Sequence, residues 1–228
     1  TLATGSGVHG LHLTNSGTGS GITPPDPVFG NDTTRLGIYG VNVTDIVISN
    51  NLIDGTDIGI GLVADSVDNL NIQISDNTVE RNDAAGLGIG AIGAAGYTFT
   101  ADISGNFDYN TDGGVAIAVE DFDTAHLTMS DLSASYNGDS GLDIELNPNG
   151  SSVITMDNIT ADSNDGYGAV GLVAYADGTD SDAGINITNS SFSNNGVGGI
   201  DDLYVRADDG AASINLDNVK TDSNSSEG

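Results

Sequence analysis

The sequence predicts an all-β fold in which short strands stack coil upon coil into one elongated solenoid. Three observations support this fold class. An apolar pattern recurs about every 28 residues, the positions within each repeat alternate between apolar and polar, and no stretch has helical periodicity. The pattern is plainest in residues 46–62, IVISNNLIDGTDIGIGL. One such unit cannot bury a core alone, whereas stacked units bury a continuous apolar column.

The first strand of each unit is anchored by one apolar residue. Successive anchors are separated by 26, 29, 26, 27, 31 and 29 residues. The residue two positions before each anchor is also apolar, and the residue between them is polar in six of the seven units. This is the alternation of a strand with one buried face. The anchors are Ile48, Ile74, Ile103, Met129, Met156, Ile187 and Leu216.

A polar turn and a second apolar run follow each anchor. The position eight residues after the anchor prefers Asn and otherwise takes Thr. We attribute this preference to the tolerance of Asn for left-handed backbone and to its hydrogen bonds with its own main chain. The residues at this position are Thr56, Asn82, Thr111, Asn137, Asn164, Asn195 and Asn224. A glycine usually introduces the second run, as at Gly86, Gly114, Gly141, Gly168 and Gly199.

These repeats resemble the right-handed parallel β-helix repeat of the pectate-lyase-like superfamily and of many bacterial surface proteins. The resemblance extends roughly from residue 5 to residue 228, with residues 14–42 as an insertion. It implies a right-handed parallel β-helix of about seven to eight coils, forming a single domain over residues 1–228. It says little about function, because the same fold serves in lyases, hydrolases, phage tailspikes, adhesins and inert stalks.

The beginning of the chain departs from the regular repeat. Residues 5–13, GSGVHGLHL, are predicted to be the second strand of a coil, with Leu11 and Leu13 pointing inward. Residues 14–35 contain three of the four prolines and are predicted to be a loop insertion, because proline cannot join a central ladder. Insertions on solenoids often lie on the binding face. Candidates for a contact loop are Pro24, Pro25, Pro27 and Phe29, and a loop that contacts only solvent is the alternative.

The composition is strongly acidic, with 33 Asp and Glu against four Lys and Arg and a net charge of −29. This balance argues against nucleic acid and anionic membrane surfaces as partners, because both require Lys and Arg. No stretch has the length and hydropathy of a membrane-inserted segment. Self-repulsion on this scale favours divalent cations or high salt around the folded chain. The chain has no cysteine, so disulfides do not contribute.

One acidic turn is a candidate calcium site. Residues 177–184, DGTDSDAG, resemble an acidic calcium loop in which Asp177, Asp180 and Asp182 would supply oxygen ligands. The spacing departs from the EF-hand pattern, and no bidentate Glu follows. A solvated acidic turn without bound metal is the alternative.

Pectate-lyase-like enzymes, which these repeats resemble, place their chemistry on outward positions of one strand ladder, and the second strand of each unit is the candidate for that ladder here. Three successive coils present only small residues there, which predicts a flat surface suited to packing: Gly59 and Gly61, Gly88 and Gly90, Ala116 and Ala118. Asp143 and Glu145 are the only paired carboxylates on that ladder, and they are weak candidates for acid–base cleavage of a glycoside. No basic residue lies beside them in the sequence.

A second possible catalytic motif has a simpler interpretation. Residues 110–113, NTDG, look like the polygalacturonase motif that supplies a catalytic Asp. The accompanying motifs of that family are not found in the same order, and Asn110 and Asp112 fall on the recurring turn. We therefore interpret NTDG as part of the turn.

Together these features predict a non-enzymatic, extracellular or cell-surface β-helix that serves as an adhesive stalk or a fibre subunit. Its expected partners are other copies of itself, associated end to end through exposed coil edges or side by side. The alternative is a carbohydrate-active or polysaccharide-binding β-helix. That function would require a groove beside Asp143 and Glu145, with an aromatic or basic residue supplied by the loop at 14–42.

Overall fold

The chain folds as an all-β structure without helices in the part described by a computed structural model, which covers residues 4–14, 36–179 and 181–225. The side chains of residues 14 and 177–179 are not included in that description. The predicted contact loop with Pro24, Pro25, Pro27 and Phe29 lies outside the described residues.

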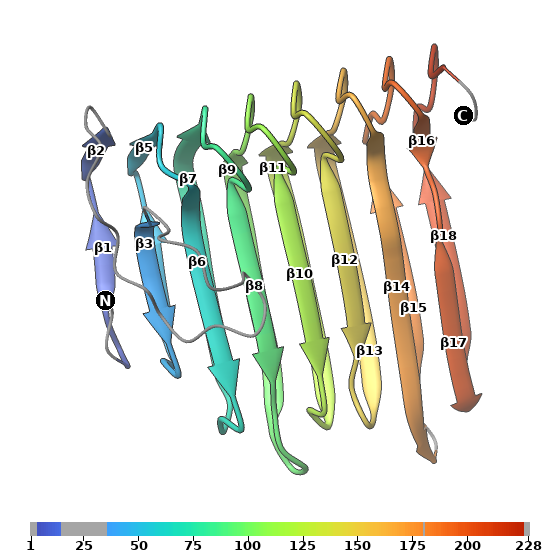
Figure 1. The fold of residues 1–228 in the computed structure, drawn as a ribbon. Helices are drawn as coiled ribbons and strands as arrows, with labels where there is room; N and C mark the ends of the chain where they lie inside the picture. The colour runs from blue at the N-terminus through green and yellow to red at the C-terminus, as the bar shows by residue number, and fades with distance from the viewer. Residues whose placement is uncertain (1–3, 15–35, 180, 226–228) are drawn as a thin grey trace.

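The strands form two parallel sheets, and successive coils lie side by side along one axis (Figure 1). Sheet A contains β1 (Gly7–His9), β2 (His12–Thr14), β4 (Ile46–Ser49), β5 (Leu52–Asp54), β7 (Leu70–Glu80), β9 (Thr98–Asn106), β11 (Thr124–Ser133), β13 (Ser151–Thr160), β15 (Ala183–Thr188) and β18 (Ala212–Asp217). Sheet B contains β3 (Leu36–Val41), β6 (Ile58–Asp65), β8 (Leu87–Ile92), β10 (Val115–Glu120), β12 (Leu142–Asn147), β14 (Tyr167–Thr179), β16 (Gly198–Ile200) and β17 (Tyr204–Asp209). The chain is a parallel β-solenoid of about six turns, slightly fewer than the seven to eight coils predicted.

The strand register confirms the anchor ladder. In sheet A, Ile48 is paired with Ile74, and Met129 is paired with Met156. Ile187 is paired with Leu216 at the far end of the sheet. Because paired residues point to the same side of a parallel sheet, this register places every anchor in one inward row.

The core is a column of anchors and of inward residues from sheet B. Ile48, Ile74, Met129 and Met156 are fully buried or nearly so, as are the sheet B residues Leu87, Ile117, Leu142 and Ile144. Four phenylalanines fill the corners: Phe99, Phe107, Phe122 and Phe192. Burying one such side chain stabilises the fold by roughly 1.5–3 kcal/mol, so the repeated column is the main source of stability.

The beginning of the chain joins a different sheet from the one predicted. Residues 7–9 and 12–14 form β1 and β2 in sheet A, where Val8 pairs with Ile48 and Leu13 pairs with Ile53. Leu13 packs against the core as expected, whereas Leu11 is 44% exposed. The prediction of a sheet B strand was wrong because Gly10, with a φ of 64°, breaks the segment into two strands.

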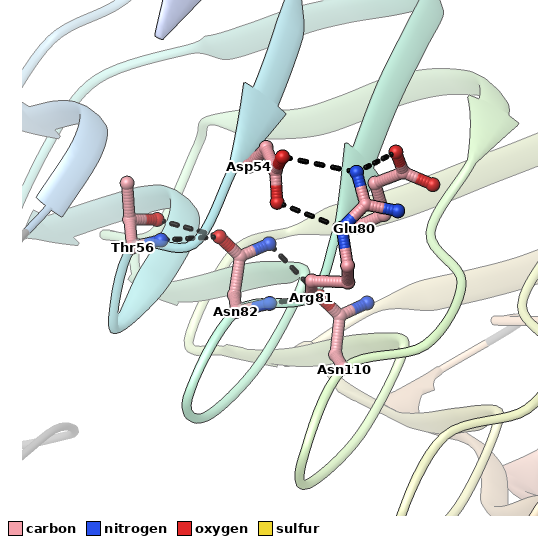
Figure 2. A network of polar contacts seen from close by, with 6 residues as sticks. All are labelled: Asp54, Thr56, Glu80, Arg81, Asn82 and Asn110. Carbon is pink, nitrogen blue, oxygen red and sulfur yellow. Dashed lines mark hydrogen bonds and ion pairs between the residues drawn. The ribbon is translucent and has the colours of Figure 1, made fainter. Parts of the chain in front are cut away.

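A ladder of buried asparagine side chains connects the coils at the turn between the sheets (Figure 2). In each coil, the backbone N–H and the side-chain Nδ2 of one Asn donate to the Oδ1 of the Asn in the next coil. For Asn137 and Asn164 these distances are 2.9 and 3.1 Å. The ladder begins at Thr56 and continues through Asn82, Asn110, Asn137, Asn164, Asn195 and Asn224.

This ladder corrects the sequence interpretation in two respects. The ladder residue of the third full repeat is Asn110, not Thr111, because the segment of β9 from Ile103 to Gly105 is one residue shorter than the segments paired with it in β7 and β11, so the turn arrives one residue earlier. The left-handed backbone lies one residue before each Asn, at Arg81, Tyr109, Tyr136, Ser163, Asn194 and Ser223. Asn is therefore selected for the side-chain hydrogen bonds between coils and not for its backbone tolerance.

The ladder also explains the recurring glycines. Four residues after each Asn, a Cβ on Gly114 would lie 2.9 Å from the Nδ2 of Asn137 and 2.7 Å from the backbone oxygen of Gly141. Gly86, Gly168 and Gly199 are crowded in the same way by the Asn amide of the next coil. A side chain at this position would push the coils apart, so Asn and Gly, spaced four apart, form one structural motif.

We predict that Asn137→Ala destabilises the protein by roughly 2–4 kcal/mol, because two donors on Asn110 lose their buried acceptor and Oδ1 of Asn164 loses one of its two donors. The free energy of unfolding from urea titration measures the effect. Asn71→Ala is the control, since Asn71 lies on the exposed face of β7. Equal losses in the two variants would contradict a stabilising role for the ladder.

Candidate functional site

The outward face of sheet B contains the acid pair identified in the sequence. Asp143 and Glu145 occupy alternate positions of β12, and both are exposed. On one side they pair with Ala116 and Ala118, which confirms small neighbours on that side. Of the residues predicted for the small face, Gly59 is instead buried near the start of β6, where a Cβ would meet the backbone oxygen of Gly86 at 2.6 Å.

A β-bulge lies on the other side of the acid pair. The register between β12 and β14 shifts, so that Asp143 pairs with Val170 and Glu145 with Val173. The bulged segment of β14 contains Gly171, whose φ is 60°. A Cβ added at Gly171 would lie 2.7 Å from Oδ1 of Asp143. Bulges are common beside functional sites because they redirect neighbouring side chains. Here glycine leaves room for the Asp143 carboxylate.

The solenoid brings aromatic and basic residues to the same face from later coils. Val173, the neighbour of Glu145, pairs with Tyr204, and Tyr175 pairs with Arg206. The rings of Tyr175 and Tyr204 lie 5.6 Å apart with a tilt of 57°. Tyr204 is therefore two strands, or about 10 Å, from Glu145 along the sheet.

Arg206 was missed by sequence reasoning because it lies about 60 residues after the acid pair. The signal that could have found it is the repeat itself, since Arg206 is two positions after Tyr204 on an outward position of the equivalent strand. Its guanidinium donates to Asp208 at 2.6 Å, and both side chains are about half exposed. The acid pair, two tyrosines and Arg206 thus form the polar part of sheet B, which we call the acid–tyrosine face.

A shallow depression continues this face toward the beginning of the chain. It encloses about 140 Å³ and is lined by residues of β6, β8 and β10, among them Gly90, Ile92, Ala118 and Glu120. Ala118 is the strand neighbour of Glu145. An extended ligand on the acid–tyrosine face could therefore continue into an apolar, open trough.

Among the described carboxylates, Asp143 and Asp157 have pKa values shifted from their ordinary value. Neighbouring protein atoms limit the hydration of Asp143 and Asp139 adds repulsion, so the pKa of Asp143 is raised. Asp157, on the exposed side of β13, accepts hydrogen bonds from Thr188 at 2.6 Å and Asn189 at 2.8 Å. These bonds favour the ionised form and lower the pKa of Asp157.

The other candidates from the sequence have different outcomes. Asn110 of NTDG is buried in the asparagine ladder, which confirms the turn interpretation. Of the calcium candidates, the side chains of Asp177 and Asp180 are outside the described set. Oδ1 of Asp182 accepts from the backbone N–H of Ala211 at 2.8 Å. Within the described residues, no group of three or more His, Cys, Asp or Glu is arranged to hold a metal, and the calcium site stays a prediction.

No protein-family model, no curated protein and no solved structure matches this chain. Among the described residues, no helix has the length and hydropathy needed to cross a membrane.

We predict opposite pH effects for Asn substitutions at the two perturbed carboxylates. A raised pKa means that ionised Asp143 opposes folding, so Asp143→Asn should raise the melting temperature at neutral pH. That advantage should shrink as the pH falls through the folded pKa of Asp143. A lowered pKa means that ionised Asp157 supports folding, so Asp157→Asn should lower the melting temperature at neutral pH.

The deficit of Asp157→Asn should disappear as the pH falls through the folded pKa of Asp157. Thermal unfolding followed by circular dichroism across this pH range measures both variants. Parallel shifts of the same sign at every pH would contradict the assignment of the two carboxylates.

Proposed function

We propose that this protein is a non-enzymatic, extracellular or cell-surface structural β-helix, of the right-handed kind found in bacterial surface proteins. It acts as a stalk or fibre subunit that associates end to end with further copies of itself. The observation that carries this proposal is the exposure of two core-type residues on β18.

Ile214 and Leu216 continue the inward row of sheet A but are 47% and 48% exposed. One edge of β18 pairs with β15, and its other edge has no strand partner in the described residues. An edge strand with an uncovered apolar face is a template for strand addition. We propose that the edge strand β1 of a second copy covers it wherever no further coil of the same chain does.

The asparagine ladder supports the same direction of growth. Oδ1 of Asn224 accepts from Asn195, and its Nδ2 donates to the backbone oxygen of Phe192. In every earlier coil of the ladder, the backbone N–H at this position donates to the Oδ1 of the Asn in the following coil. The backbone N–H of Asn224 is therefore placed to donate in the same way to an acceptor on an added coil. Such a contact joins two different surfaces, so it repeats without closing and yields a filament.

We predict that Leu216→Lys abolishes end-to-end association, because it places a charge in the inward row of the proposed contact. Sedimentation velocity and electron microscopy, with and without calcium, measure the assembly. Asn215→Lys is the matched control, because Asn215 lies on the outward side of the same strand. A wild-type protein that stays monomeric at high concentration in both conditions would remove the end-to-end part of the proposal.

A second candidate function is the binding of an acidic or neutral polysaccharide on the acid–tyrosine face. The juxtaposition of Tyr175, Tyr204 and Arg206 with the acid pair favours it. Tyrosine rings can stack on sugar faces, and Arg can donate two hydrogen bonds to a uronate carboxylate. The sequence had assigned this supporting role to the 14–42 loop, whereas the described supporting residues come from β14 and β17.

For this second function, we predict that Arg206→Ala weakens binding of oligogalacturonate by about tenfold, the loss expected for one charge-assisted hydrogen bond. Isothermal titration calorimetry measures the affinity. Arg81→Ala is the control, because Arg81 is ion-paired with Asp54 and Glu80 away from this face (Figure 2). Chain cleavage that disappears in Asp143→Asn or Glu145→Gln would instead indicate an enzyme.

A further inference from the structure

Two exposed tyrosines form a stacked pair on the ridge of turns beside the asparagine ladder. Tyr109 and Tyr136 precede Asn110 and Asn137 in successive coils. Their rings are parallel within 4°, and the ring centroids lie 4.9 Å apart. The two residues are 52% and 54% exposed, and neither hydroxyl has a hydrogen-bond partner among the described residues. The pair therefore contributes little to the core.

The backbone position makes tyrosine an unfavourable choice there. Both residues have a φ of 60°, in the left-handed region that bulky side chains rarely adopt. The equivalent position holds Ser163, Asn194 and Ser223 in later coils, and these are small polar residues suited to such turns. The stacked rings add a contact between two coils, but their hydroxyl groups and about half of each side chain stay exposed, which leaves both residues accessible to a ligand. Strained residues of this kind concentrate at binding sites.

The charge around the pair is predominantly negative. Asp108 and Asp162 lie on the same ridge, one residue before the left-handed position, and each accepts from a backbone N–H of the next coil, at 2.7 and 2.6 Å. Asp112, Asp139 and Asp165 are exposed on the other side of the ladder. The chain has no Lys or Arg between Arg81 and Arg206. Arg81, in the coil before Tyr109, is ion-paired with Asp54 and Glu80 (Figure 2).

Electron-rich ring faces inside a negative potential favour a cation. A guanidinium or ammonium group over a tyrosine face is attracted by the ring quadrupole, and surrounding carboxylates add to this attraction. A neutral sugar could stack on the rings, but the negative potential would add nothing to its affinity. We propose that Tyr109 and Tyr136, with the flanking aspartates, bind an arginine-bearing basic segment of a partner protein. This ridge is separate from β18 and from the acid–tyrosine face, so the proposal does not depend on either proposed function.

The test uses a fluorescently labelled hexa-arginine peptide, whose binding is measured by fluorescence anisotropy at physiological salt. We expect the double variant Tyr109→Asn/Tyr136→Asn to weaken binding at least about fivefold, the loss expected when two exposed cation–π contacts are removed. Asn is chosen because Asn194 occupies the equivalent position, so the backbone is preserved. The double variant Tyr109→Phe/Tyr136→Phe should bind within about twofold of the natural protein, since it keeps both rings.

The controls distinguish binding that depends on the tyrosine rings from binding to the acidic surface as a whole. Tyr204→Asn, on the acid–tyrosine face, should leave hexa-arginine binding unchanged, and a hexa-citrulline peptide, which is neutral, should not bind. Unchanged affinity in the Tyr109→Asn/Tyr136→Asn variant, or no binding by the natural protein, would overturn the proposal. Binding of cellohexaose that depends on both tyrosines, without binding of hexa-arginine, would also overturn it and identify a carbohydrate platform. Melting curves establish that each variant is folded.

Discussion

The structure depends on the hydrogen bonds that connect buried asparagine side chains from coil to coil. A solenoid must turn its chain at every corner, and a corner close to the core leaves polar backbone groups without strand partners. At this corner, the Oδ1 of each Asn satisfies the backbone N–H and the amide of the Asn before it, as Asn164 does for Asn137. The cost of burying these amides is offset only while the row is continuous. One interaction therefore fixes the coil spacing, demands glycine four residues later, and sets where sheet B begins.

This internal constraint leaves the outward positions free to vary. Inward residues repeat the same chemistry in every coil, whereas the outward residues of sheet B change from Ala116 to Asp143 across one strand pairing. The turn position before the ladder changes in the same way, from Tyr136 to Ser163. The outward side chains of a solenoid can therefore change from coil to coil along the axis, while the inward residues that stabilise the fold stay the same. Proposed sites on different faces can be altered separately.

The sequence predicted the inward rows well and the corners less well. The Ile48 ladder could be recognised because apolar alternation has a direct physical cause, and its register is confirmed. The Asn110 position was missed because β9 is one residue shorter than its neighbours just before Gly105, and a fixed offset from the anchor cannot detect such a change. Likewise, the alternation around Gly10 spans two strands. Arg206 joined the acid–tyrosine face only through strand pairing, since neighbours in space on a solenoid are a full repeat apart in sequence.

The charge of the chain bears on how copies would associate. With 33 acidic and four basic residues, the sides of two rods repel each other over a distance of about 10 Å at 0.1 M salt. The end contact proposed for β18 would involve backbone hydrogen bonds and the apolar residues Ile214 and Leu216, which act at short range and are not weakened by salt in the same way. If copies associate as proposed, axial growth would therefore be favoured over lateral packing. Contact between the sides of two rods would require a cationic bridge, and the ridge at Tyr109 and Tyr136 has the chemistry to hold one.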